Sequence, residues 1–145
     1  MAEDVVLTEL EIEENDLLTR AIAYAVAMHK GGLRKGTNMP YIVHPLEVLN
    51  NLYLMKADKK LMAAGVLHDT VEDTEATLED ITVLFGQDVT ELVASHTEKD
   101  KTLSWIVRKK LALEEWAHAK KREKMLVLAD KLSNIRAMVR DYKAI

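Results

Sequence analysis

Four side chains that can bind a divalent metal ion occur in three separate segments of the sequence: His44, the adjacent pair His68 and Asp69, and Asp130. Two neutral imidazoles and two carboxylates form a mixed nitrogen and oxygen donor set. Such a set suits a transition metal such as Mn²⁺, Fe²⁺ or Zn²⁺, with coordination positions left for water. The chain has no cysteine, so thiolate ligands, iron–sulfur clusters and thiol nucleophiles are excluded.

Further acids follow the His68–Asp69 pair. Glu72 and Asp73 come one helical turn later, where like charges repel each other. Because residues 61–66 before the pair are apolar, the acids lie at the end of a face that should be buried, and burial makes unpaired charges costly. Three carboxylates around one imidazole favour a bound cation. The alternative interpretation is a solvated acidic helix end.

Asp130 lies among apolar residues. It follows the apolar run 125–129 and is a helix-face neighbour of Asn134, since residues four apart share a face. A carboxylate flanked by apolar stripes needs partners. A surface ion pair with Lys131 or Arg136 is the alternative. One flanking stripe consists of Met125, Leu128, Leu132, Ile135 and Val139.

The remaining histidines have plainer alternatives. His44 precedes Pro45, which suits the first turn of a helix and would aim the imidazole rigidly, yet a lone histidine here also fits a capping or packing role. His29, at the end of the first predicted helix, fits the same roles. His96 and His118 have no supporting pattern, and we expect both at the surface.

Composition and charge limit the partners. The net charge is −4, but the first 16 residues carry seven acids and no Lys or Arg, which leaves about +3 on the rest of the chain. We therefore expect no duplex nucleic-acid partner, which would require a basic stripe. No apolar run is long enough to span a membrane, and the acidic N-terminus lacks a basic secretory start. We expect a cytoplasmic protein without a membrane partner; its oligomeric state is left open.

The elements that must position these residues are all predicted to be helices. Only five glycines and two prolines occur in 145 residues, and 145 residues suffice for one domain with its own core. We expect an acidic lead-in over residues 1–13 and an all-α core over residues 14–141. Apolar spacing and capping signals predict six or seven helices. Asp58 is expected to cap the third of them, and Thr77 to begin a short one that ends at Gly86. The predicted ranges are 14–30, about 45–55, 59 to about 69–71, 77–86, 87–96, 102–119 and 121–141.

The order of these motifs resembles the HD superfamily of metal-dependent phosphohydrolases, which are all-helical proteins. Four blocks are similar to the hydrolase domain of RelA/SpoT-type proteins: His29–Lys35, Pro40–Pro45, Leu67–Thr74 and Leu128–Arg136. The resemblance covers roughly residues 17–140. HDTVEDT and LADKLSNIR are its most specific parts.

The resemblance implies Mn²⁺-dependent removal of the 3′-pyrophosphate from the alarmones ppGpp and pppGpp, a small guanine-nucleotide substrate. By position, it implies that His44, His68, Asp69 and Asp130 bind the metal. It also implies that Glu72 and Asp73 position or activate the attacking water. Further roles it implies are nucleotide binding by Arg34, Lys35 and Asn134, and support of the site by His29, which is not a ligand.

Two alternatives to this function remain: an HD phosphohydrolase that acts on another nucleotide, and a non-catalytic HD module that binds one. The chain ends at Ile145, soon after the last motif, whereas domains of this family usually continue with further helices. Truncation at the C-terminus is therefore one interpretation of the sequence.

Overall fold

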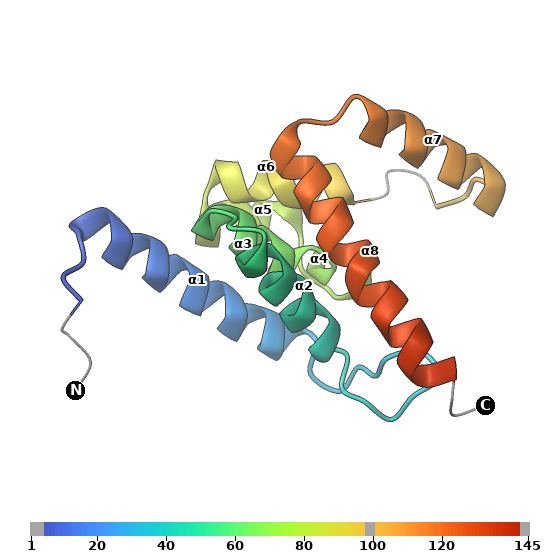
Figure 1. Cartoon of the computed structure of the whole chain (residues 1–145), viewed down its shortest axis with the longest axis horizontal. Coiled ribbons are helices and arrows are strands. Elements are labelled where there is room, and N and C mark those ends of the chain that lie inside the picture. The colour runs from blue at the N-terminus through green and yellow to red at the C-terminus, as the bar shows by residue number, and fades with distance from the viewer. Residues whose placement is uncertain (1–4, 98–100, 143–145) are drawn as a thin grey trace.

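The computed structural model describes residues 5–97 and 101–142, and within these ranges all regular secondary structure is helical (Figure 1). The all-α prediction is confirmed. Seven helices of at least two turns and the single turn α4 are described. In chain order they are α1 (Glu9–Met28), α2 (Val43–Leu54), α3 (Lys59–Leu67), α4 (Thr70–Asp73), α5 (Leu78–Phe85), α6 (Gln87–His96), α7 (Trp105–Ala117) and α8 (Lys121–Tyr142).

Side chains at the N-caps explain where α3 and α5 begin. The Asp58 carboxylate accepts a hydrogen bond from the Leu61 backbone N–H at 2.9 Å, which satisfies one of the donors that a helix start leaves open. Thr77 and Asp80 form the reciprocal capping box at the start of α5. Both caps agree with the sequence prediction, because capping depends on residues only three positions apart.

The first helix begins earlier than its apolar pattern predicts. Thr8 accepts a hydrogen bond from the Glu11 backbone N–H at 3.1 Å, so α1 starts at Glu9 rather than at residue 14. Glu9 and Glu11 of the expected acidic lead-in lie in this first turn. They stabilise the start of the helix, because the partial charge at a helix N-terminus is positive.

Helix α3 lies at the centre of the core and packs against α1, α2, α6 and α8 (Figure 1). Every residue from Leu61 to Leu67 is buried. Gly65 permits the closest approach to α2, because a Cβ atom there would collide with Leu52 Cδ1. The C-terminal end of α3, which leads directly to His68, is thereby held deep in the molecule.

The sequence predicted one helix through residues 69–71, but the structure breaks it. Helix α3 ends at Leu67 and α4 begins at Thr70. The Thr70 hydroxyl donates to the Leu67 carbonyl at 2.8 Å, which satisfies an acceptor that a helix end leaves open. His68 and Asp69 therefore lie in the junction between two helices and need not follow either helical face.

Helix α8 buries a different face from the one that its longest apolar stripe suggested. The buried residues of α8 are Leu126, Ala129, Asp130, Ser133 and Ala137. In contrast, Leu128, Ile135 and Val139 of the predicted stripe are between 57 and 62% exposed. Asp130 is thus part of the buried face itself. Of the ion pairs offered as an alternative, the one with Lys131 is present, with Nζ 3.5 Å from Asp130 Oδ2, but the carboxylate is buried rather than at the surface.

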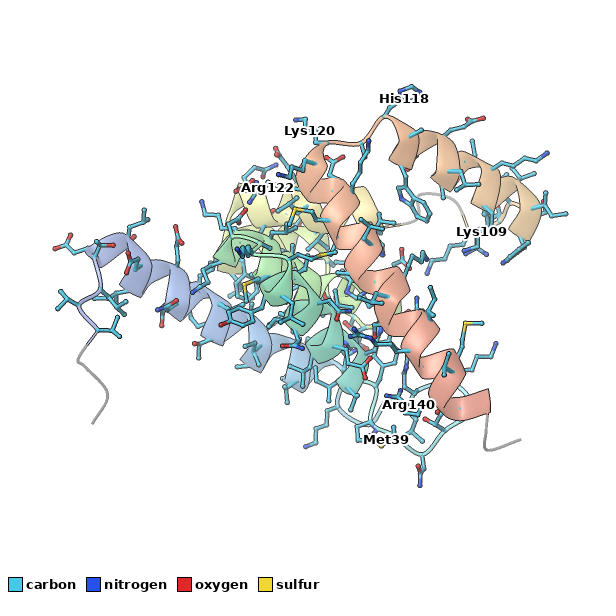
Figure 2. The ribbon with its side chains drawn as sticks, viewed as in Figure 1. Met39, Lys109, His118, Lys120, Arg122 and Arg140 are labelled. Carbon is cyan, nitrogen blue, oxygen red and sulfur yellow. The ribbon has the colours of Figure 1, made fainter. Side chains whose placement is uncertain are left out.

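Arg122 ties the start of α8 to the other helices. Its guanidinium donates to both carboxylate oxygens of Asp58, at 2.9 and 3.0 Å, and to Asp88 on α6 at 3.1 Å. Figure 2 shows Arg122 at the end of α8 that lies next to α6. Bidentate guanidinium–carboxylate pairs fix geometry as well as charge, so this contact sets where α8 crosses the core.

No helix in the described part of the chain has both the length and the apolar character that a membrane crossing requires.

Candidate metal centre

Four predicted ligand residues from three helical segments meet at one point. His44 lies on α2, His68 and Asp69 lie at the α3–α4 junction, and Asp130 lies on α8. One ligand atom from each lies within 4.8 Å of all the others. His68 Nε2 is 3.1 Å from both Asp69 Oδ2 and Asp130 Oδ1. Within the described residues this is the one group of its kind.

A hydrogen-bond chain fixes the tautomer of His44. The Ser133 hydroxyl lies 2.6 Å from a Glu47 carboxylate oxygen and 2.9 Å from His44 Nδ1. Because the carboxylate can only accept, the hydroxyl proton points to Glu47, and Ser133 must accept a hydrogen bond from Nδ1–H. The neutral ring therefore turns a bare Nε2 toward Asp130 Oδ1, 2.9 Å away.

The ring of His68 is oriented in the same way by the backbone. Its Nδ1 lies 2.6 Å from the Gly65 carbonyl oxygen, and a carbonyl can only accept, so Nδ1 carries the proton. Nε2 then points to the carboxylates of Asp69 and Asp130. Orientation of a ligand histidine through its other nitrogen is usual at metal sites.

The donor set fits a divalent cation. Two imidazole nitrogens and two carboxylate oxygens, each of which presents a lone pair, converge in a largely buried site. Burial alone would lower the pKa of His68, but the Asp69 and Asp130 carboxylates outweigh it and raise the pKa to about 10. His68 Nε2 therefore takes up a proton when no metal ion is bound. With or without the metal ion, the two carboxylates need a positive charge at this point.

Tyr41 supports Asp69 from the loop before α2. Its hydroxyl donates a short hydrogen bond to Asp69 Oδ2. Burial would raise the pKa of Asp69, but the charge and hydrogen bond of His68 together with the Tyr41 hydroxyl hold that pKa well below its usual range. Burial of the Tyr41 hydroxyl and its contact with Asp69 raise the pKa of Tyr41 far above 10. Asp69 is therefore ionised, as a metal ligand must be, and Tyr41 stays a hydrogen-bond donor.

The structure separates the two acids that were predicted to act together. Glu72 lines the cavity of about 250 Å³ that contains His44, Asp69 and Asp130, and its carboxylate lies 3.9 Å from Lys101 Nζ. Asp73 lines a neighbouring cavity instead. Burial and the Asp69 charge raise the pKa of Asp73. Of the two, Glu72 is the one that faces the cluster.

The predicted nucleotide-binding residues lie at the edge of the cluster. Arg34 Nη2 is 3.4 Å from Asn134 Oδ1, and these two residues line both the cluster's cavity and an adjoining cavity of about 590 Å³. Lys35 lines the adjoining cavity and the cavity of Asp73, but not the cavity of the cluster. The loop is closed by hydrogen bonds from Arg34 N to Met39 O and from Tyr41 N to Gly32 O, so Arg34 is held on a short hairpin.

His29 is buried but is not among the four converging residues. Its ring lies 4.9 Å from the Tyr41 ring, and burial lowers its pKa. It borders the same cavity as Asp73. His29 therefore lies next to Tyr41, whose hydroxyl donates to Asp69, and its supporting role stays a prediction.

The expectation that His96 is a surface residue is wrong. Its side chain is 11% exposed, and Nε2 lies 3.4 Å from Asp130 Oδ2. The sequence carries a signal for this position, because His96 extends the buried i, i+3, i+4, i+7 stripe of Val89, Leu92 and Val93. His118, by contrast, is exposed as expected.

Two lysines that the sequence did not single out as binding residues also line the cluster's cavity: Lys109 of α7 and Lys131 of α8. Lys131 Nζ lies 3.5 Å from Asp130 Oδ2 and 5.3 Å above the Trp116 ring. Figure 2 shows Lys109 beside the space between α7 and α8. Together with Arg34, these side chains place three cations around the four metal-ligand candidates.

An all-helical fold with a His–Asp pair completed by a distant histidine and aspartate is the arrangement of an HD domain. The chain belongs to the HD domain family, whose model matches residues 21–145. It is similar to the guanosine-3′,5′-bis(diphosphate) 3′-pyrophosphohydrolase MESH1 of Xenopus tropicalis, with 42% identity over 127 residues that cover 86% of this chain and 70% of that protein. The MESH1 of Homo sapiens is 39% identical over 126 residues, which cover 85% of this chain and again 70% of the relative.

A solved structure supports the same assignment. It is described as a metazoan orthologue of SpoT that hydrolyses ppGpp and plays a role in starvation responses. It is 34% identical, covers 93% of this chain and 73% of its own, and has a TM-score of 0.79. The chain is also 45% identical over 86 residues to a GTP pyrophosphokinase of Myxococcus xanthus, but these cover only 11% of that protein.

Proposed function

We propose that this protein is a Mn²⁺-dependent 3′-pyrophosphohydrolase that converts ppGpp and pppGpp into GDP or GTP and pyrophosphate. The observation that carries the proposal is the shared wall between two cavities. His44, Asp69 and Asp130 line the first cavity. The second is large enough for a nucleoside, and Arg34 and Asn134 border both. The similarity to the MESH1 hydrolases and to the SpoT orthologue supports the substrate.

His44, His68, Asp69 and Asp130 would hold the metal ion. A divalent ion at such a site supplies a water nucleophile at neutral pH and neutralises charge on phosphoryl oxygens. The mixed nitrogen and oxygen donors suit Mn²⁺ among other transition metals. The protein's part is to keep both imidazoles in the tautomer that leaves Nε2 free, through Ser133 and the Gly65 carbonyl.

Glu72 is the residue that we assign as proton acceptor. Its carboxylate lines the cavity that holds the ligands, so it can take a proton from the attacking water. In the reaction the water oxygen bonds to the phosphorus attached to the ribose 3′ oxygen. The bond between that phosphorus and the 3′ oxygen breaks, and the oxygen receives a proton to become the 3′ hydroxyl. We assign Asp73, in the adjacent cavity, to support of this step.

The cations around the cluster account for the charge of the substrate. Arg34, Lys109 and Lys131 line the cavity, where they can contact pyrophosphate oxygens or the nucleotide. Arg34 can also stack on a purine through its planar guanidinium. Lys35, Ala137 and Met138 line the adjoining cavity, which offers apolar surface for a nucleobase. A substrate that spans both cavities would have its 3′-pyrophosphate at the ligands and its guanosine beside α8.

Pyrophosphate release from ppGpp by the purified, Mn²⁺-loaded protein tests this proposal directly. The assay should include pppGpp, GDP and a reduced dinucleotide phosphate as competing substrates. We expect fast release from ppGpp and pppGpp, and loss of release when a chelator removes the metal. A higher kcat/KM for another nucleotide would assign a different substrate to the same centre. Binding of ppGpp without turnover in the Mn²⁺-loaded protein would make the domain a sensor instead.

A further inference from the structure

His96 is the last residue of α6 and lies against the ligand cluster without belonging to it. Its ring centre is 5.1 Å from that of His68, at 71°, and it lines the same cavity. Its Nε2 is 3.4 Å from Asp130 Oδ2. It is not one of the four residues whose ligand atoms all converge.

The two oxygens of Asp130 have different surroundings. Oδ1 faces the Nε2 atoms of His44 and His68, at 2.9 and 3.1 Å. Oδ2 faces hydrogen-bond donors instead, namely His96 Nε2 at 3.4 Å, Lys131 Nζ at 3.5 Å and Asn134 Nδ2 at 3.5 Å. Oδ1 is therefore directed toward the point where the four ligand atoms converge, and Oδ2 is held away from it.

Among the three donors, His96 alone comes from another helix. Lys131 and Asn134 are on α8 together with Asp130 and move with it, and the Lys131 side chain is 42% exposed. His96 is on α6 and its side chain is 11% exposed. Its contact therefore fixes the Asp130 carboxylate relative to the rest of the core as well as relative to its own helix.

Packing alone does not account for a histidine at this position. Nδ1 of His96 is buried and has no hydrogen-bond partner among the described residues. An apolar side chain would fill the same space without an unpaired buried nitrogen, which is unfavourable. The polar contact of Nε2 with Asp130 is what a histidine adds over a valine or leucine.

We propose that His96 is a positioning residue of the metal centre. Its Nε2–H donates to Asp130 Oδ2 and so restricts Asp130 to ligation through Oδ1. This inference rests on the metal site of the proposed function. Carboxylate ligands are commonly held by such outer contacts, whose loss typically costs ~10–100-fold in metal affinity.

The test is calorimetric titration of the metal-free full-length chain with Mn²⁺. We expect His96→Leu to weaken Mn²⁺ binding ~10–100-fold. His96→Gln should recover most of the affinity, because its amide can donate to Oδ2. His118→Leu, at an exposed histidine, should bind like the wild type. Thermal unfolding of each metal-free variant separates loss of affinity from loss of fold.

Three results would overturn the inference but leave the metal site in place. Equal Mn²⁺ affinity of the wild type and of folded His96→Leu would show that the contact has no effect on the metal. Failure of His96→Gln to recover affinity would show that donation to Oδ2 is not the cause. A Mn²⁺-bound crystal structure with His96 Nε2 in direct coordination would make it a ligand. Absence of Mn²⁺ binding by the wild type would reject the proposed metal site as well, so the two failures can be told apart.

Discussion

Nε2 of His44 lies 2.9 Å from Oδ1 of Asp130, although neither atom carries a hydrogen when His44 is neutral. The proton of the ring is on Nδ1, where Ser133 accepts it and in turn donates to Glu47. Two acceptors this close repel each other unless a proton or a metal ion lies between them. The site is therefore built to be completed by a cation.

Ser133→Ala should weaken metal binding without unfolding the protein. The substitution removes the acceptor that keeps the proton on Nδ1 of His44, so the ring is free to present a protonated Nε2 to the cluster. We expect a ~10–100-fold loss of Mn²⁺ affinity by calorimetry. Ser95→Ala is the matched control, since Ser95 lines the same cavity but donates only to the Leu92 carbonyl. Equal affinities of the two variants would contradict the tautomer argument.

Glu72→Gln should abolish most activity while metal binding is retained. Glu72 lines the cavity but is not one of the four converging residues. Loss of a general base typically costs ~10²–10⁴-fold in rate, which kcat for ppGpp hydrolysis measures. We expect Asp73→Asn to lower kcat less, because Asp73 borders the adjacent cavity. A larger effect of Asp73→Asn would transfer the role of proton acceptor to Asp73.

Arg34→Lys should weaken substrate binding more than it slows the chemical step. A lysine keeps the charge but loses the planar fork and the contact with Asn134. We expect KM for ppGpp to rise roughly tenfold, as loss of a charged hydrogen bond of about 1.5 kcal/mol implies. Arg20→Lys is the matched control, because Arg20 pairs with Asp16 on α1. An unchanged KM would remove Arg34 from the substrate site.

Metal binding should release protons near neutral pH. The pKa of His68 in the metal-free protein is raised from 6.5 to about 10 by Asp69 and Asp130, which outweigh its burial. The ring is therefore protonated at neutral pH, and the metal must displace that proton. Apparent Mn²⁺ affinity should rise with pH between neutrality and about 10. Calorimetry in buffers of different ionisation enthalpy counts the protons, and a binding enthalpy that does not depend on the buffer would contradict this prediction.

Some features could be predicted from the sequence because they are local. The caps at Asp58 and Thr77 depend on residues three positions away, and the all-α fold follows from helical apolar spacing. The four metal-ligand candidates were recognisable from residue type and motif. Their convergence at one point could not be predicted from the sequence. His44 and Asp130 are 86 residues apart, and sequence spacing does not predict contacts at that range.

Other features depend on tertiary packing and were missed for that reason. The stripe of α8 that includes Ile135 is the more apolar, yet the structure buries the face of Asp130 and Ser133, since that face completes a polar network with α2 and the end of α3. The spacing from Val89, Leu92 and Val93 indicates that His96 is buried, but it does not indicate what His96 contacts. Its importance comes from α6 packing against α8, which only the assembled fold shows.

Diffraction at the manganese absorption edge, from crystals grown with Mn²⁺, shows whether the four converging side chains hold a metal ion. We expect one anomalous peak enclosed by His44 Nε2, His68 Nε2, Asp69 and Asp130, and loss of that peak in Asp130→Asn crystals of the same fold. A peak at another place, or no peak at this position in wild-type crystals, would contradict this expectation.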